Sequence, residues 1–323
     1  MLGLTVEFVS GLVLLIWGAD RFANGSVSIA HCLGVNPLLI GLTVVAFATS
    51  APEILVSIVA SLHGDSDLAI GNAIGSNIVN IGLVLGVVAL IRPIPMNSKT
   101  VRREMPMLLA VSLLTVSLFL DSYISRTDGF VLLVGLVIVM AWLTRIGLRS
   151  SVDDPIVAEI GAEIPQYTSH MATGIQLAIG LAALLIGAEL LVDGAVDIAV
   201  RLGVSDVVVG IVLVAFGTSL PELAVSVASA VKGEFGMVIG NIVGSNIFNS
   251  LAVVGIASAI QPAILPPSVL SLHIFVMVAF TLVLFASTYD LEGKQQISRL
   301  EGFSMVVAFL AYEIYTVAPV LIG

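Results

Sequence analysis

The sequence predicts an all-α, polytopic membrane protein with ten transmembrane helices arranged as two inverted five-helix repeats. Three observations support this fold class. Hydrophobic residues make up 58 % of the 323 residues and charged residues only 11 %, whereas soluble domains average about 25 % charged residues. Ten apolar segments are long enough to cross a bilayer. The two halves of the chain also match each other in order and spacing.

The composition excludes several classes of protein. Too few charges remain for the surface of a soluble enzyme or for a disordered chain. The net charge is −10, and no basic tract could follow a phosphate backbone, so we expect the lipid bilayer and no nucleic acid as a partner. The single cysteine, Cys32, excludes an intrachain disulfide and a cysteine-based metal cluster. No basic residue precedes the first apolar run, so we expect a spanning helix there rather than a cleaved signal.

The predicted spans need about 20 mostly apolar residues each, and the fourth is at the short limit. The ten spans are 4–24, 34–62, 68–91, 105–121, 129–148, 171–195, 203–231, 236–260, 268–287 and 302–321. The longest polar connector is acidic and broken by prolines. We therefore predict a first five-helix repeat at 1–148, a linker at 149–170 and a second, inverted repeat at 171–323.

The basic residues predict the orientation in the membrane. If the N-terminus is outside, ten Lys and Arg residues lie at the inner ends and loops and two, Arg126 and Arg201, at the outer ones. Such a bias places the basic side in the cytoplasm. We expect a multi-pass protein of the cell (inner) membrane with both termini outside and the 149–170 linker inside.

The internal repeat has an offset of 169 residues and needs no gap. Residues 41–53 lie over 210–222, and residues 71–80 lie over 240–249. Within 34–86, 23 of 53 positions are identical to their partners, including Thr, Ser, Pro, Glu, Asn and Gly in order. Five spans per repeat is an odd number, so the second repeat enters the membrane from the other side. Inverted repeats are typical of secondary transporters.

Glu53 and Glu222 occupy equivalent positions in the middle of apolar spans. A charged side chain at a helix centre costs about 2.5–3.5 kcal/mol on insertion scales, so such a residue is a candidate functional group. The alternative is a structural, protonated carboxyl group. That reading is weaker for two residues at equivalent positions of an inverted repeat.

Each glutamate follows a proline, which cannot donate to the carbonyl four residues earlier. We expect unwound backbone with free carbonyls around 46–48 and 215–217, because such backbone is tolerated where it lines a cavity. Hydroxyl groups lie within one turn before each glutamate. Back-bonding to the helix is the alternative role for them, but we favour cation ligation. These hydroxyl residues are Thr49, Ser50, Thr218 and Ser219.

A second polar pattern, Gly-Asn-x-x-Gly-Ser-Asn-x-x-Asn, occurs at 71–80 and 240–249. Its glycines are four apart and allow close helix packing. Ser76 shares a helix face with Asn80, and Ser245 shares one with Asn249. The other asparagines are either interhelical hydrogen-bonding residues or ligands. They are Asn72, Asn77, Asn241 and Asn246.

The combined site contains oxygen atoms only. Hard cations such as Ca²⁺ take six to eight oxygens, and two carboxylates neutralise one Ca²⁺. Zinc, copper and iron prefer nitrogen or sulfur ligands, and the four histidines lie near span ends without clustering. We therefore expect a hard-cation site and no cofactor.

These two duplicated patterns resemble the α-repeats of the cation/Ca²⁺ exchanger superfamily, particularly prokaryotic Na⁺/Ca²⁺ exchangers. The resemblance covers essentially the whole chain. It implies four cation sites, one preferring Ca²⁺ and the others taking Na⁺, with the first and sixth spans sliding for alternating access. By resemblance, the metal ligands are Glu53, Glu222, Thr49, Thr218, Ser50, Ser219, Ser76, Ser245, Asn80, Asn249 and the backbone oxygens of Ala46 and Ala215.

The resemblance implies a secondary antiporter of Na⁺ and Ca²⁺ that is not an enzyme and that we expect to act as a monomer. Asn249 departs from relatives with Asp there, notably K⁺-dependent exchangers, so we expect K⁺ independence. A H⁺/Ca²⁺ exchanger is the nearest alternative, because two membrane carboxylates can also carry protons. A passive channel and an intramembrane enzyme are weaker alternatives, since the inverted repeat favours alternating access and no catalytic motif occurs.

Overall fold

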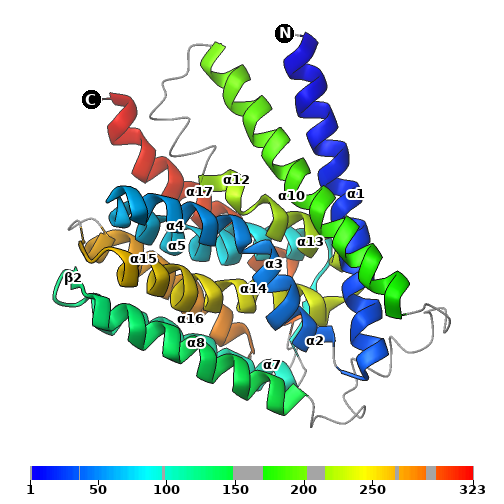
Figure 1. Cartoon of the computed structure of the whole chain (residues 1–323), viewed down its shortest axis with the longest axis horizontal. Coiled ribbons are helices and arrows are strands. Elements are labelled where there is room, and N and C mark those ends of the chain that lie inside the picture. The colour runs from blue at the N-terminus through cyan, green and yellow to red at the C-terminus, as the bar shows by residue number, and fades with distance from the viewer. Residues whose placement is uncertain are drawn as a thin grey trace.

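The computed structural model describes residues 2–35, 37–96, 99–147, 170–201, 215–265, 269–288 and 296–322. Within them the chain is an all-α membrane protein, which confirms the predicted fold class (Figure 1). The predicted linker, apart from His170, and the start of the seventh span lie outside the described residues. The division into two repeats and a linker stays a prediction.

The described helices of the first repeat follow the predicted spans, with π-helical segments labelled η. They are α1 (Leu2–Leu33), α2 (Pro37–Ile40), η1 (Gly41–Val45), α3 (Ala46–Thr49), α4 (Ala51–His63), α5 (Ser66–Val79), η2 (Asn80–Leu85), α6 (Gly86–Ile91), α7 (Lys99–Phe119) and α8 (Arg126–Gly147). Those of the second repeat are α10 (His170–Arg201), α12 (Ala215–Thr218), α13 (Leu220–Val231), α14 (Phe235–Phe248), η4 (Asn249–Val253), α15 (Val254–Ile260), η5 (Val269–His273), α16 (Ile274–Thr288) and α17 (Arg299–Ile322).

By length and composition, five helices among the described residues could each cross a membrane. There are six if the pair Pro37–Thr49 and Ala51–His63, bent by 43°, is one span. The apolar parts of α7 and α13 are shorter, at Glu104–Phe119 and Leu220–Val231. For α7 this agrees with the short fourth span that the sequence predicts.

The first predicted span ends too early. The structure continues α1 to Leu33, nine residues beyond the predicted end at 24. No proline interrupts residues 25–33, and the helix stops where Gly34 takes the left-handed φ of 65°. Glycine adopts this conformation without a Cβ clash, so it ends helices. The predicted end of the sixth span at 195 is short as well, because α10 continues to Arg201.

The two long helices α1 and α10 pack side by side and antiparallel (Figure 1). Glycines recur every seven residues at the contact and are equivalent in the two repeats. A Cβ on Gly18 would meet the backbone of Leu184, and a Cβ on Gly187 would meet the backbone of Leu15. Small residues let membrane helices approach this closely. Without them, α1 and α10 could not pair backbone to backbone.

The two spans that carry Glu53 and Glu222, here called the signature spans, each break two residues before the proline. Ser50, with φ −82° and ψ 5°, separates α3 from α4, and Ser219, with φ −91° and ψ 5°, separates α12 from α13. The proline then takes one of the first two positions of the next helix, where its missing N–H group has no consequence.

Two π-helical segments begin at equivalent asparagines, η2 at Asn80 and η4 at Asn249. A π-turn inserts one extra residue into a helix and often marks a functional site. Asn80 and Asn249 lie within helices, as the predicted spans require, but the sequence pattern does not predict this change in helical register.

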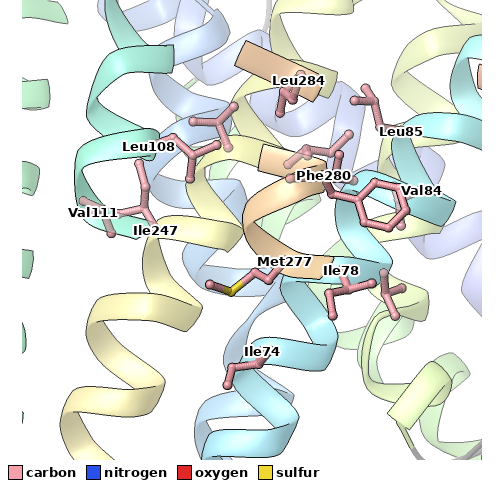
Figure 2. Close-up of a cluster of buried hydrophobic side chains, with 14 of the residues drawn as sticks. Ile74, Ile78, Val84, Leu85, Leu108, Val111, Ile247, Met277, Phe280 and Leu284 are labelled. Carbon is pink, nitrogen blue, oxygen red and sulfur yellow. The ribbon is translucent and has the colours of Figure 1, made fainter. Parts of the chain in front are cut away.

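The central helices α5 and α14 are held by a hydrophobic core that α7 and α16 share (Figure 2). The core surrounds the polar residues of α5 and α14 with buried apolar side chains. Its labelled members are Ile74, Ile78, Val84, Leu85, Leu108, Val111, Ile247, Met277, Phe280 and Leu284.

Two short antiparallel strand pairs join the repeats outside the helices. β1 (Ile94–Pro95) pairs with β4 (Gln296–Ile297), and β2 (Tyr123–Ile124) pairs with β3 (Ala263–Ile264). Each pair joins a loop of one repeat to a loop of the other. Paired strands must lie on the same side of the membrane, so the loops before α7 and before α17 share one side.

Candidate cation-binding site

The two glutamates lie at the start of equivalent helices and are fully buried. Glu53 is in the first turn of α4, and Glu222 is in the first turn of α13. Both side chains have 0 % exposure. A carboxylate in the first turn of a helix is favoured by the helix dipole, which partly offsets the cost of burying its charge.

Each repeat presents hydroxyl groups to the glutamate of the other repeat. Ser50 donates from Oγ to Oε1 of Glu222 over 3.2 Å. Thr218 and Ser219 of the second repeat are correspondingly the hydroxyl residues near the Glu53 carboxylate, although neither Glu53 oxygen has a hydrogen-bond partner. In the sequence these hydroxyls lie within one turn of the glutamate of their own span. In the structure the two spans cross at the break, so Ser50 contacts the glutamate of the other repeat.

Residues of the second polar pattern, at 240–249, complete the surroundings of Glu222. Ser245 donates from Oγ to Oε1 of Glu222 over 3.4 Å. Thr49 lies opposite, with Oγ1 3.1 Å from Oδ1 of Asn241 and 3.4 Å from Oγ of Ser245. Thr49 Oγ1 is also 3.1 Å from the carbonyl of Val45. Back-bonding of this hydroxyl therefore occurs together with its contact to the other repeat.

Asn72 and Asn241 tie the signature helices of each repeat together. Asn241 donates from Nδ2 to the backbone carbonyl of Glu222 over 3.3 Å and to Ser226 over 3.0 Å. Asn72 makes the equivalent bonds to the carbonyl of Glu53 and to Ser57, each at 3.5 Å. The sequence left two roles open for these asparagines, interhelical hydrogen bonding or cation ligation, and the bonds seen here are interhelical. Ser57 and Ser226 are not among the residues that the sequence predicts for the site. Their occurrence at equivalent positions of the two repeats was a signal that could have identified them.

The asparagines at the starts of η2 and η4 differ in their partners. Asn80 donates from Nδ2 to Oδ1 of Asn246 over 3.0 Å. Neither polar atom of the buried Asn249 side chain has a hydrogen-bond partner. Asn77 bonds to Ser250 over 3.0 Å. Asn77 and Asn246 therefore connect the repeats, and Asn249 keeps its amide oxygen available.

Several buried oxygens at this crossing have no hydrogen-bond partner. An unpaired buried oxygen is costly, and a bound cation would offset that cost. These atoms are both carboxylate oxygens of Glu53, Oε2 of Glu222, Oγ of Ser76 and Ser219, and Oδ1 of Asn80 and Asn249. The donor set is oxygen only, which suits a hard cation.

The expected release of the Ala46 carbonyl is not what the structure has. The Ala46 carbonyl accepts the Ser50 N–H over 3.0 Å, because α3 stays helical up to Thr49. The equivalent N–H of Ser219 bonds instead to Phe216 over 3.2 Å. The Ala46 oxygen also lies 3.4 Å from Oγ1 of Thr49. A carbonyl oxygen has two lone pairs, so Ala46 and Ala215 remain candidate ligands.

The described residues contain no group of three or more His, Cys, Asp or Glu that could hold a metal ion. Two of the histidines have other partners. His63 contacts the carbonyl of Val59 at 2.8 Å, and His273 contacts the Tyr312 hydroxyl at 2.7 Å. The site thus depends on two carboxylates and neutral oxygens.

Comparisons with known proteins agree with this geometry. The sequence profile of the family described as "sodium/calcium exchanger protein" matches residues 3–145 and 173–318. The chain belongs to the sodium/calcium exchanger family. As a family member it is a multi-pass membrane protein and a Ca²⁺-exchanging antiporter, and the family consists of transporters rather than catalysts.

Relatives cover this exchanger along its whole length. It is 44 % identical to CaxA of Alkalimonas amylolytica over 313 residues, which are 97 % of this chain and 98 % of that one. It is 32 % identical to the sodium/calcium exchanger MaX1 of Methanosarcina acetivorans over 347 residues, covering 96 % and 98 %. The solved structure of the sodium-calcium exchanger NCX_Mj is similar, with a TM-score of 0.82, 37 % identity and coverage of 98 % and 97 %.

Proposed function

We propose that this antiporter exchanges Na⁺ for Ca²⁺ by alternating access, without a requirement for K⁺ and with net movement of charge. The observation that carries the proposal is the crossing of the two repeats. There, two buried carboxylates of opposite repeats share a space with unpaired hydroxyl and amide oxygens. The two negative charges balance one Ca²⁺ or two Na⁺.

Na⁺ rather than H⁺ is favoured as the counter-ion by the neutral oxygens. A proton needs only a carboxylate, whereas Na⁺ needs several oxygens around it. The unpaired oxygens of Ser76, Ser219 and Asn80 have no role in a proton carrier. The printed name of MaX1, a sodium/calcium exchanger, points in the same direction.

The ligands that we propose combine both signature patterns of both repeats. Glu53 and Glu222 are the shared carboxylates, and the neutral ligands lie within the same crossing. The neutral set comprises Thr49, Thr218, Ser50, Ser219, Ser76, Ser245, Asn80, Asn249 and the backbone oxygens of Ala46 and Ala215. Asn249 carries no charge, so K⁺ is not needed to balance a third carboxylate.

The proposed stoichiometry predicts that the membrane potential drives exchange. A third Na⁺, which the family resemblance implies, would travel with one net positive charge. Each charge is worth about 2.3 kcal/mol per 100 mV. With Na⁺ inside liposomes, an interior made positive with external K⁺ and valinomycin should speed ⁴⁵Ca²⁺ entry. Uptake that ignores the potential would indicate electroneutral exchange of two Na⁺ or two H⁺ per Ca²⁺.

The counter-ion and the K⁺ requirement are separated in matched liposomes with no imposed potential. Ca²⁺ uptake is expected with internal Na⁺ and external choline, and not with an internal proton gradient alone. Uptake that stops when choline replaces K⁺ would contradict our interpretation of Asn249. Uptake driven by the proton gradient alone would favour the H⁺/Ca²⁺ alternative.

We also propose that both termini are outside the cell membrane and that the protein acts as a monomer. In a Cys32→Ser background, Ser151→Cys in the predicted linker should react with an impermeant thiol reagent only from the cytoplasm. Asp121→Cys, in the exposed turn before β2, should react only from outside. Labelling on the opposite sides would overturn the orientation.

A further inference from the structure

The two repeats differ in how their long helices dock. Helix α1 lies along α13 of the other repeat. The equivalent pair in the inverted repeat is α10 and α4, and within the described residues these two make no comparable contact. Figure 1 shows the upper part of α10 leaning away from α4. Two repeats of matching sequence are thus held in different arrangements.

One polar cluster holds α1 against α13. Lys232, at the end of α13, forms an ion pair of 2.5 Å with Asp20 and donates to Asn24 over 2.8 Å. Asn24 in turn donates to Asp20 over 3.3 Å. The nearby Glu234 has a pKa raised by burial, although the Lys232 charge acts to lower it. Asp20 is the carboxylate that pairs with Lys232 across the helices.

The rest of this interface is apolar and contains a groove. An apolar groove of about 450 Å³ lies between α1, α10 and α13 and ends at Asp20 and Lys232. Ala224 and Ala228 of α13 line it. Their equivalents on α4, Leu55 and Val59, are 62 % and 54 % exposed.

The polar cluster has an inverted counterpart at the same offset of 169 residues. Glu189 replaces Asp20, Asp193 replaces Asn24, and His63 replaces Lys232. The helix ends match as well, since Gly64 and Gly233 both have left-handed φ values, 94° and 83°. A lysine on one side of the protein therefore corresponds to a histidine on the other.

We propose that these two clusters are alternating latches, and that the His63 latch makes one side of the exchanger sensitive to pH. In the other half of the cycle α10 docks on α4, and His63 pairs with Glu189 and Asp193. That side is the outer one if the proposed topology holds. Asp20 and Lys232 then separate.

The sign of the pH effect follows from the charges around His63. Histidine changes its charge between pH 5 and 8, and only the protonated ring attracts Glu189 and Asp193. The described charges on the elements packed against α4 are acidic, Asp65 and Asp67 beside α5, while α3, α15 and η4 carry none. Acid therefore favours docking of α10, and alkali releases it.

The test measures a distance between spin labels on α5 and α10, at Leu68 and Ile186, which are 60 % and 51 % exposed. In the Cys32→Ser background at constant Na⁺ and Ca²⁺, lowering the pH from 8 to 5.5 should raise the short-distance population. We expect an increase of about two- to fivefold, as for an exposed ion pair. Asp20→Asn should raise the same population at every pH.

The variants separate the latch from other titrating groups. His63→Gln should remove the pH response, and His63→Lys should keep the short distance populated at pH 8. If His63→Gln misfolds, Glu189→Gln with Asp193→Asn removes the partners instead. His273→Gln is the matched control and should leave the response intact. A wild-type distance that ignores pH, or a response that survives His63→Gln, would overturn the proposal, whatever counter-ion the transport assay identifies.

Discussion

Replacing Glu53 or Glu222 with glutamine is expected to reduce ⁴⁵Ca²⁺ exchange to the background of empty liposomes. Both side chains are fully buried and supply the only carboxylates at the crossing of the described signature helices. Removing one partner of a buried charge pair costs about 3–5 kcal/mol, which corresponds to at least a hundredfold loss of cation affinity. The amide keeps the shape of the side chain, so the fold should persist.

The two glutamate variants need a control that also loses a carboxylate. Asp67→Asn, on the exposed start of α5, changes the net charge equally but lies away from the crossing. It should exchange Ca²⁺ at close to the wild-type rate. All three variants should elute from size exclusion as the wild type does. Near-normal exchange by either glutamate variant would mean that the cation site is misplaced.

Alanine at Gly18 or Gly187 is expected to destabilise the protein and slow exchange strongly. At each position a Cβ would meet the backbone of the partner helix, not a side chain that could move aside. Overpacking of this kind costs about 1–3 kcal/mol or more. The strain must be relieved by moving α1 and α10 apart, which disturbs the pair that carries both latch clusters.

Gly135→Ala provides the matched control, because this glycine is also within a spanning helix. A Cβ at Gly135 would lie 3.6 Å from the Leu251 side chain, an ordinary van der Waals distance. Thermal unfolding in detergent and Ca²⁺ exchange in liposomes should therefore change far less than in Gly18→Ala. Equal effects of Gly135→Ala and Gly18→Ala would show that Gly18 is not needed for the close contact of α1 with α10.

The sequence by itself was sufficient for the fold class and for the buried glutamates. Composition decides between water and lipid as the surrounding solvent, and an odd number of spans per repeat decides the inversion. Glu53 and Glu222 stand out because an ionisable residue within an apolar span is costly unless it has a function. The positions of the chain breaks follow approximately from Pro52 and Pro221, since proline stops a helix locally.

The partners across the site were decided only by the tertiary structure. Helical periodicity relates residues three or four apart, so in the sequence Ser50 is near only the glutamate of its own span, Glu53. The structure instead pairs Ser50 with Glu222, because the breaks of the two repeats cross each other. Two repeats with the same motif cannot reveal from sequence which copy of a residue faces which copy of its partner.

The sequence likewise does not predict that the long helices of the two repeats dock differently. Asp20 and Lys232 are in contact, while His63, Glu189 and Asp193 occupy the equivalent positions without the docking of α10 on α4. The sequence supports both arrangements, because the offset of 169 residues relates them. Which one is adopted depends on the small free-energy difference between two packings of the same helices. That difference arises from contacts between segments distant in the chain, which only the folded structure brings together.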